Sequence, residues 1–226
     1  KKIFEKFDLC LVANNESEHY LKILGAKNIK NYGNLKFANT KLNSKNNLNT
    51  NLVNKIQDRM IWCAASTHPT EEIFCAKTHL KLKKIYNNIL TIIIPRHVDR
   101  INKINNDLSN LNLKIVFYSN LSKMSANTDI LLIDLYGETS KFFNLSKCVF
   151  LGGSLIKHGG QNPIEPSRFG CKIFHGPNVN NFSEIYEYLK SFDYRKKSLP
   201  FFKMGYRTSN THELVGCSLC RCVVPS

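Results

Sequence analysis

The sequence predicts an α/β fold built on a doubly wound parallel sheet, and two observations lead to this prediction. From residue 60 onward, short apolar runs alternate with helical segments, which is the order that joins parallel strands through crossover helices. Four of the apolar runs are followed directly by polar or glycine residues. Ligands of such a sheet bind beyond the carboxyl ends of its strands, so we expect a binding site at that edge.

Residues 1–50 are predicted to hold one strand–helix–strand unit. The apolar run at 7–13 predicts a strand, and Ser17 is the best candidate for the cap of the helix that follows. A short apolar run at 29–32 predicts the second strand. The Asn- and Lys-rich stretch from residue 36 to 54 then predicts a linker or surface loop.

Residues 51–192 are predicted to form the main domain, whose strands are short and apolar. We expect strands at 60–65, 89–94, 113–118, 130–133, 148–151 and 171–174. The segments between them predict helices at 52–58, 70–88, 99–108 and 139–144. Acidic residues begin the helix at 70–88 and lysines end it, which favours the helix dipole at both ends.

The glycine-rich stretch from Val149 to Phe182 is the clearest candidate for a ligand-binding loop. Glycine permits a backbone N–H group to approach an anion that a side chain would keep away. The candidate residues of this stretch are Gly152, Gly153, Ser154, Gly160, Gln161, Asn162 and Glu165. The carboxylate of Glu165 is placed to accept hydrogen bonds from sugar hydroxyls. The alternative is a glycine-rich connection that binds nothing, since such motifs often occur by chance.

Three further strand ends carry polar residues that we expect to meet the glycine-rich stretch at one edge of the sheet. They are Ser66, Thr67 and His68, then Arg96 and His97, and lastly Gly137 and Glu138. Each group alone is weak evidence, whereas the convergence of all of them predicts a site. His68 has an alternative interpretation as a cap of the next helix. His79 is interpreted as a surface or core residue of a helix, and His158 as an exposed loop residue.

The chain is strongly basic, with 32 Lys and Arg against 17 Asp and Glu and a net charge of +15. This favours an anionic partner, such as nucleic acid, an anionic membrane surface or a phosphorylated ligand. No common nucleic-acid module is recognised by its signature, so no nucleic acid is expected as a partner. No apolar run approaches the roughly 18 residues that a transmembrane helix needs.

Six motifs together resemble those of a known enzyme family. They are WCAASTH, IIIPRH, DLYGE, FLGGSL, GGQNPIEP and HGPNVNNF. In this order and spacing they closely resemble the C-terminal half of the 3-deoxy-D-manno-octulosonic acid (Kdo) transferases of lipid A assembly, over about residues 4–189. The resemblance implies the Rossmann-like C-terminal domain of a GT-B glycosyltransferase, which binds the donor CMP-Kdo.

The resemblance also implies roles for the candidate residues. Residues 152–154 would donate hydrogen bonds to the phosphate or the sugar carboxylate, and Glu165 would hold the ribose hydroxyls. Arg96 would face the anionic donor with its fork of N–H groups, and His97 would orient Arg96 or touch the nucleotide. Tyr136 stands where the family more often has a methionine. The other expected donor contacts are Gly137, Glu138, Gly160, Gln161 and Asn162, with Ser66, Thr67 and His68 on the donor side of the cleft.

Two departures from the family limit what this chain is expected to do. The family's N-terminal domain, which would carry the acceptor site and the general base, has no counterpart in these 226 residues. We therefore expect a fragment without a catalytic residue that does not transfer Kdo alone. Residues 193–226 do not resemble the family and predict a divergent tail, which a frameshift would explain. Cys217, Cys220 and Cys222 cluster there without the further ligands that a zinc site needs.

The predicted function is inverting, metal-independent transfer of Kdo from CMP-Kdo to a lipid A precursor in lipopolysaccharide core biosynthesis, with no cofactor. The expected partners are CMP-Kdo, the acceptor through the missing domain, the anionic cytoplasmic face of the bacterial inner membrane, and a separate N-terminal half. The alternative is an inactive nucleotide-binding remnant without turnover. A nucleic-acid-binding protein is a third interpretation, which depends on charge alone.

Overall fold

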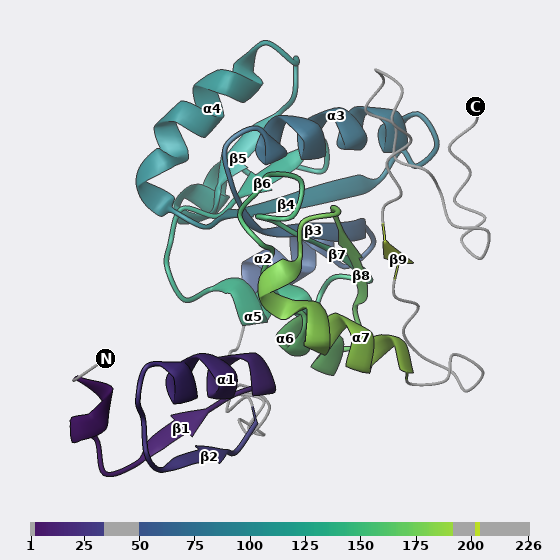
Figure 1. Ribbon diagram of the computed structural model, residues 1–226. Helices are drawn as coiled ribbons and strands as arrows, with labels where there is room; N and C mark the ends of the chain where they lie inside the picture. The colour runs from purple at the N-terminus through teal and green to yellow at the C-terminus, as the bar shows by residue number, and fades with distance from the viewer. Residues whose placement is uncertain (1–2, 34–49, 192–201, 204–226) are drawn as a thin grey trace, which may run out of the picture. The chain divides into compact units, whose positions relative to one another are not determined.

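The computed structural model of the chain describes residues 3–33, 50–191 and 202–203 (Figure 1). The chain divides into two compact units, Lys1–Asn43 and Ser44–Ser226. The predicted boundary after residue 50 falls close to this division and stays a prediction. The cysteine cluster of the predicted tail, at 217–222, lies outside the described residues.

The N-terminal unit is the predicted strand–helix–strand. Strands β1 (Cys10–Val12) and β2 (Ile29–Asn31) pair in parallel and are joined by helix α1 (Asn15–Ile23). The cap of α1 is Asn14, whose Oδ1 accepts a hydrogen bond from the N–H of Ser17 at 2.8 Å. The prediction of Ser17 as the cap is therefore wrong. Asn and Ser both cap helices well, so residue type alone did not separate the two positions.

The second unit is built on a seven-stranded sheet in the order β5-β6-β4-β3-β7-β8-β9, and every neighbouring pair is parallel. The strands are β3 (Met60–Thr67), β4 (Ile89–Pro95), β5 (Ile115–Phe117), β6 (Ile130–Leu132), β7 (Cys148–Leu151), β8 (Lys172–His175) and β9 (Phe202–Lys203). Six of them match predicted strands. The short β9 lies within the predicted tail, where the sequence predicts no strand, and it extends the sheet beside β8.

Helices cover both faces of this sheet (Figure 1). Helices α3 (Glu71–Lys83) and α4 (Ile101–Ser109) lie on one face. The other face carries α2 (Thr50–Ile56), α5 (Thr139–Phe143), α6 (Ile164–Arg168) and α7 (Ser183–Ser191). Alternate strand residues supply the two cores, because successive side chains point to opposite faces of a sheet. Within the described ranges, no helix is both long and apolar enough to span a membrane.

The direction in which the sheet grows reverses between β3 and β7. Strands β4, β6 and β5 follow on one side of β3, and β7, β8 and β9 follow on the other. At such a switch point the loops that leave two neighbouring strands diverge toward opposite faces, which opens a crevice at the carboxyl ends. The predicted α/β, Rossmann-like doubly wound fold is confirmed, and the loops after β3 and β7 meet at this switch point.

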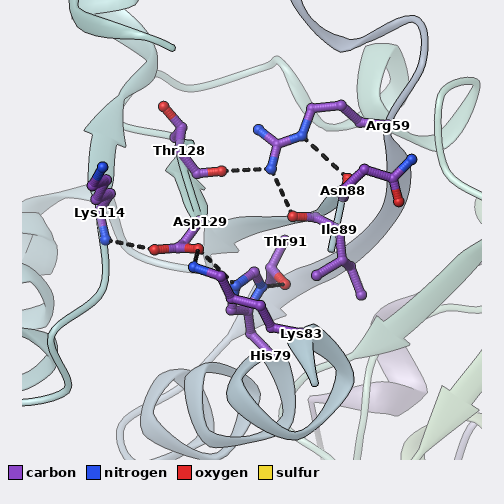
Figure 2. Close-up of polar contacts among 9 residues, drawn as sticks. All are labelled: Arg59, His79, Lys83, Asn88, Ile89, Thr91, Lys114, Thr128 and Asp129. Carbon is purple, nitrogen blue, oxygen red and sulfur yellow. Dashed lines mark hydrogen bonds and ion pairs between the residues drawn. The ribbon is translucent and has the colours of Figure 1, made fainter. Parts of the chain in front are cut away.

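A polar network closes the opposite edge of the sheet, where the strands begin (Figure 2). Asp129 precedes β6, and one of its carboxylate oxygens accepts hydrogen bonds from His79 and Lys83 of α3. The other oxygen accepts from the backbone N–H of Lys114 at 2.9 Å. The second ring nitrogen of His79 lies 2.8 Å from the hydroxyl of Thr91 in β4. The network thus ties α3 to three strands of the sheet.

Arg59 completes this edge beside β3 (Figure 2). Its guanidinium donates to the carbonyl oxygens of Ile89 and Thr128, both at 2.6 Å, and to that of Asn88 at 3.3 Å. Burial raises the pKa of Asp129, but the hydrogen bonds from Lys83, Lys114 and His79 outweigh it, and the pKa lies below its usual value. The Asp129 carboxyl group is therefore ionised in the fold, and the ammonium group of Lys83 balances its charge.

Candidate donor-binding site

The end of β3 and the loop that follows it contain strained backbone at the switch point. Ser66 and Thr70 have φ values of +54° and +79°, a region that non-glycine residues seldom adopt. The register between β3 and β4 shifts between Ala65 and Thr67. Backbone strain of this kind persists only where the surrounding structure enforces it, and it clusters at binding sites. Two such residues so close together mark the end of β3 as a candidate site.

The glycines after β7 allow that loop to pack directly on the loop after β3. A Cβ atom added to Gly152 would lie 2.2 Å from the carbonyl oxygen of Ser66, so no side chain fits there. Gly153 has a φ of +65°, which glycine adopts without strain. The two loops are therefore in backbone contact, and the predicted convergence of residues 66–68 with 152–154 is observed.

A carboxylate that the sequence analysis did not select holds these two loops together. Glu71, the first residue of α3, is fully buried, with 0% of its surface exposed. One of its oxygens accepts from the N–H groups of His68 at 2.9 Å and Gly153 at 2.7 Å. The other accepts from Ser154 at 3.1 Å and Leu155 at 3.0 Å. Burial raises the pKa of Glu71, and these four donors oppose that shift.

Ser154 is also occupied by the protein itself. Its hydroxyl donates to the carbonyl oxygen of Leu151 at 2.5 Å and accepts from the N–H of Gly176 at 2.9 Å. Its carbonyl oxygen accepts from the backbone N–H of Asn178 at 3.0 Å. The role of residues 152–154 as donors to a bound phosphate stays a prediction. The N–H groups of Gly153 and Ser154 could bind a phosphate only if the phosphate displaced the carboxylate of Glu71, to which they already donate.

Three histidine rings gather beside the glycine loop. The ring centroids of His68 and His158 lie 4.2 Å apart, and those of His68 and His97 lie 6.1 Å apart. The amide nitrogen of Gln161 lies 3.5 Å from Nε2 of His68. His68 is buried, whereas His97 and His158 are exposed. Burial, together with the nearby His158, His97, Arg100 and Arg96, lowers the pKa of His68 to about 4.

The charges around these rings are positive. Arg100 pairs with the buried Glu72, with N–O distances of 3.0 and 3.4 Å. Arg96 is exposed, and among the described residues it has no carboxylate partner. The same holds for His97 and His158. We call Arg96, His68, His97 and His158 the cationic cluster, because Arg96 is charged and a bound anion would favour the protonated form of the histidines; the low pKa of His68 leaves it neutral without one. An anion is the ligand that such a group of side chains is suited to bind.

The loop after β6 joins the second half of the glycine-rich stretch. Ser140 of α5 donates to a carboxylate oxygen of Glu165 in α6 at 2.6 Å. Glu138 pairs with Lys141 at 2.6 Å, and Gly137 has a φ of +80°. The structure therefore brings the predicted residues 137–138 and 165 to neighbouring loops of one edge. The exposed Tyr136 stands in the same loop, with 72% of its surface accessible.

The remaining predicted residues shape these loops from within. Gly160 donates its N–H to the carbonyl oxygen of Gly153 at 2.8 Å. Asn162 accepts from the N–H of Ile164 at 3.0 Å, which turns the chain into α6. Thr67 is buried, and its backbone oxygen accepts from the N–H of Arg96 at 2.9 Å. In the described ranges, no group of three or more His, Cys, Asp or Glu side chains is arranged to hold a metal ion.

Sequence reasoning missed three residues whose partners are distant along the chain. Glu71 was interpreted only as an acidic residue in a first helical turn. His158 is exposed as predicted, but its ring packs on His68. His79 is a core residue, which was one of its two predicted alternatives, and its membership of the Asp129 network was not predicted. The position of His158 between two glycine pairs could have indicated a site residue. For Glu71, the sequence shows only that it lies in the first turn of a helix.

Several known proteins are similar to this chain, although no protein-family model matches. The 3-deoxy-D-manno-octulosonic acid transferase of Haemophilus influenzae is 37% identical over 174 residues, which are 71% of this chain and 41% of that protein. That of Aquifex aeolicus is 27% identical over 190 residues, or 84% of this chain and 50% of the relative. The chain thus spans half or less of the length of these curated relatives.

Two further matches concern the predicted domain and tail. A bifunctional glycosyltransferase/methyltransferase of Fusobacterium nucleatum is 28% identical over 222 residues, covering 95% of this chain and 32% of that protein. An alignment of that extent includes part of the predicted tail at 193–226. The crystal structure of the C-terminal CMP-Kdo binding domain of WaaA from Acinetobacter baumannii superposes with a TM-score of 0.55. It is 30% identical, and the match covers 58% of this chain and 68% of that domain.

Proposed function

Because this chain belongs to the family of the 3-deoxy-D-manno-octulosonic acid transferases, we propose that it supplies the donor-binding half of a glycosyltransferase. In this proposal, the chain binds CMP-Kdo for transfer of Kdo to a lipid A precursor in lipopolysaccharide biosynthesis. The observation that carries the proposal is the cationic cluster at the switch point of a domain that resembles a CMP-Kdo binding domain. CMP-Kdo bears a phosphate and a carboxylate, and both suit this cluster.

The proposal gives each part of the site a separate task. Arg96 and His97 face the anionic groups of the donor, because they are exposed and have no carboxylate partner within the described part of the chain. Glu165 accepts hydrogen bonds from the ribose, with Ser140 fixing one of its oxygens. Gln161, which lies beside His68, and the neighbouring Asn162 are further proposed donor contacts. The cationic side chains would neutralise the leaving phosphate, so we propose a reaction that needs no metal.

We further propose that the general base and the acceptor site come from an N-terminal half like that of the longer relatives. An inverting transfer needs a base to take the proton from the attacking hydroxyl of the acceptor, and in this proposal the side chains of the cationic cluster serve the anionic donor instead. The basic surface of the chain would favour the anionic cytoplasmic face of the inner membrane, where the phosphorylated lipid acceptor lies.

Titration of CMP into the purified chain, followed by calorimetry, tests the donor site. We expect saturable binding to one site, with cytidine binding at least tenfold more weakly because it lacks the phosphate. AMP serves as the control for recognition of the base. Equal affinity for CMP and cytidine, or no binding of CMP, would contradict the proposal.

A transfer assay with CMP-Kdo and a lipid A precursor tests the division of labour. The chain alone is expected to give no transfer, and co-expression with the N-terminal half of a relative is expected to restore it. Transfer by the chain alone would refute the claim that the base is supplied from elsewhere. Binding of CMP without restored transfer would favour the inactive nucleotide-binding remnant.

A further inference from the structure

The buried carboxylate of Glu71 occupies a position that glycine loops often offer to a ligand. Consecutive backbone N–H groups of a turn form a concave anion site, and here Gly153, Ser154 and Leu155 present such a series. Both carboxylate oxygens lie against these groups, and the N–H of His68 adds a fourth donor. With 0% of its surface exposed, Glu71 leaves no room for a second anion in the turn.

The place of Glu71 in the fold explains why its charge is tolerated there. It is the first residue of α3, and the positive end of a helix dipole stabilises an anion at this point. The four N–H groups come from the loops after β3 and β7, so one side chain fixes both walls of the switch point. Gly153 in turn lies against two rings of the cationic cluster. A Cβ atom there would be 3.0 Å from His158 and 3.3 Å from His68.

We propose that Glu71 is a positioning residue for donor binding, which fills the anion-binding turn of the glycine loop with an internal carboxylate. The turn is therefore a fixed support for His68 and His158, and the anionic groups of the donor bind to the side chains of the cationic cluster. This inference rests on the proposed function. It differs from the expected role of residues 152–154, because the backbone of the turn does not hold the phosphate.

Substitution of Glu71 gives opposite results under the two arrangements. If the turn supports the cluster, Glu71→Gln leaves two of the four N–H groups facing an amide NH₂, and the affinity for CMP falls at least tenfold. If the turn is instead the phosphate site, removal of the competing carboxylate tightens CMP binding. Glu72→Gln is the matched control. It removes a neighbouring buried carboxylate of α3 that serves Arg100, and its affinity for CMP should change less than threefold.

Rescue by a small carboxylate separates positioning from general damage. Glu71→Ala empties the space beside the four N–H groups, and acetate can occupy it. We expect acetate to restore CMP binding by Glu71→Ala toward the wild-type value, with chloride at the same ionic strength as the control. Acetate should not affect the wild type or Glu72→Ala. Unchanged or tighter CMP binding by the Glu71 variants overturns the inference, and so does a loss that acetate does not restore.

The wild-type chain provides a measurement that needs no variant. Amide protons of Gly153, Ser154 and Leu155 are expected to remain protected from exchange when CMP is added, and the Glu71 carboxyl carbon resonance is expected to stay in place. The ring signals of His68 and His158 should shift instead. Displacement of Glu71 by CMP, seen as a shift of its carboxyl resonance at saturation, overturns the inference. If the wild type does not bind CMP at all, the proposed function fails. That outcome differs from the failure of the Glu71 inference, in which the wild type binds CMP but Glu71 is displaced.

Discussion

Charged side chains are arranged differently at the two ends of the strands of the main sheet, which we call its two edges. At the edge where the strands begin, Asp129 pairs with Lys83 and accepts a hydrogen bond from His79, and two nitrogens of Arg59 donate to backbone carbonyl groups (Figure 2). At the edge where they end, the carboxylates of Glu71, Glu72 and Glu138 have partners inside the protein, whereas the exposed Arg96 has no carboxylate partner within the described residues. The first edge stabilises the fold, and the second keeps positive charge available for a ligand.

This contrast follows from the cost of leaving groups unpaired. A buried ionised group without a partner destabilises a fold by several kcal/mol, so the charged groups of the buried edge have their partners inside the protein. An exposed cation costs little, because water solvates it until an anion replaces the water. The contrast therefore predicts that substitutions at the first edge change stability alone. Those in the exposed part of the second edge should change binding alone.

The largest expected effect is at the first edge. Asp129→Ala leaves His79 and the N–H of Lys114 without their acceptor and should lower the free energy of unfolding by about 3 kcal/mol. Urea denaturation measures this loss, and Asp107→Ala, an exposed acid on α4, is the control, with a change within about 0.5 kcal/mol. CMP affinity of folded Asp129→Ala should equal that of the wild type. A tenfold weaker affinity would break the separation of the two edges.

A substitution in the cationic cluster should have the opposite pattern of effects, with a loss of CMP affinity and little change in stability. Arg96→Ala should weaken CMP binding about 10- to 100-fold, because a charge-assisted hydrogen bond contributes about 1.5–3 kcal/mol. Its free energy of unfolding should stay within about 0.5 kcal/mol of the wild type, since Arg96 is exposed. Arg96→Lys keeps the charge without the planar fork and should lose less affinity. A large loss of stability in Arg96→Ala would show that this edge, too, is part of the structural framework.

The sequence predicted the features of these edges that depend on neighbouring residues, but not those that depend on residues far apart along the chain. Short apolar runs and the residues that follow them are local features, so the parallel sheet and the convergence of its loops were predictable. Glu71 was not, because one of its donors, Gly153, lies 82 residues further along the chain. The same applies to His79, whose partner Asp129 lies 50 residues away. An acid in a first helical turn looks the same in sequence whether it faces water or a second loop.

The smallest expected effect concerns the one buried member of the cationic cluster. The pKa of His68 is lowered to about 4 from 6.5, so the unfolded chain binds a proton more tightly than the folded one. Its contribution to stability is therefore fully present above pH 6.5 and is lost as the pH falls toward 4. His68→Asn should remove roughly 1–2 kcal/mol of this pH dependence, and His19→Asn serves as the control at an exposed position.

Urea denaturation of both variants at a series of pH values measures this slope. Burial also lowers the pKa of His79, so the difference between His68→Asn and the wild type is the quantity to compare. An anion bound in the cluster would favour the protonated form of His68, and CMP should therefore reduce the slope of the wild type but not that of His68→Asn. If CMP left both slopes unchanged, His68 would be a structural residue that does not interact with the ligand. The exposed side chains of the cluster would then bind CMP alone.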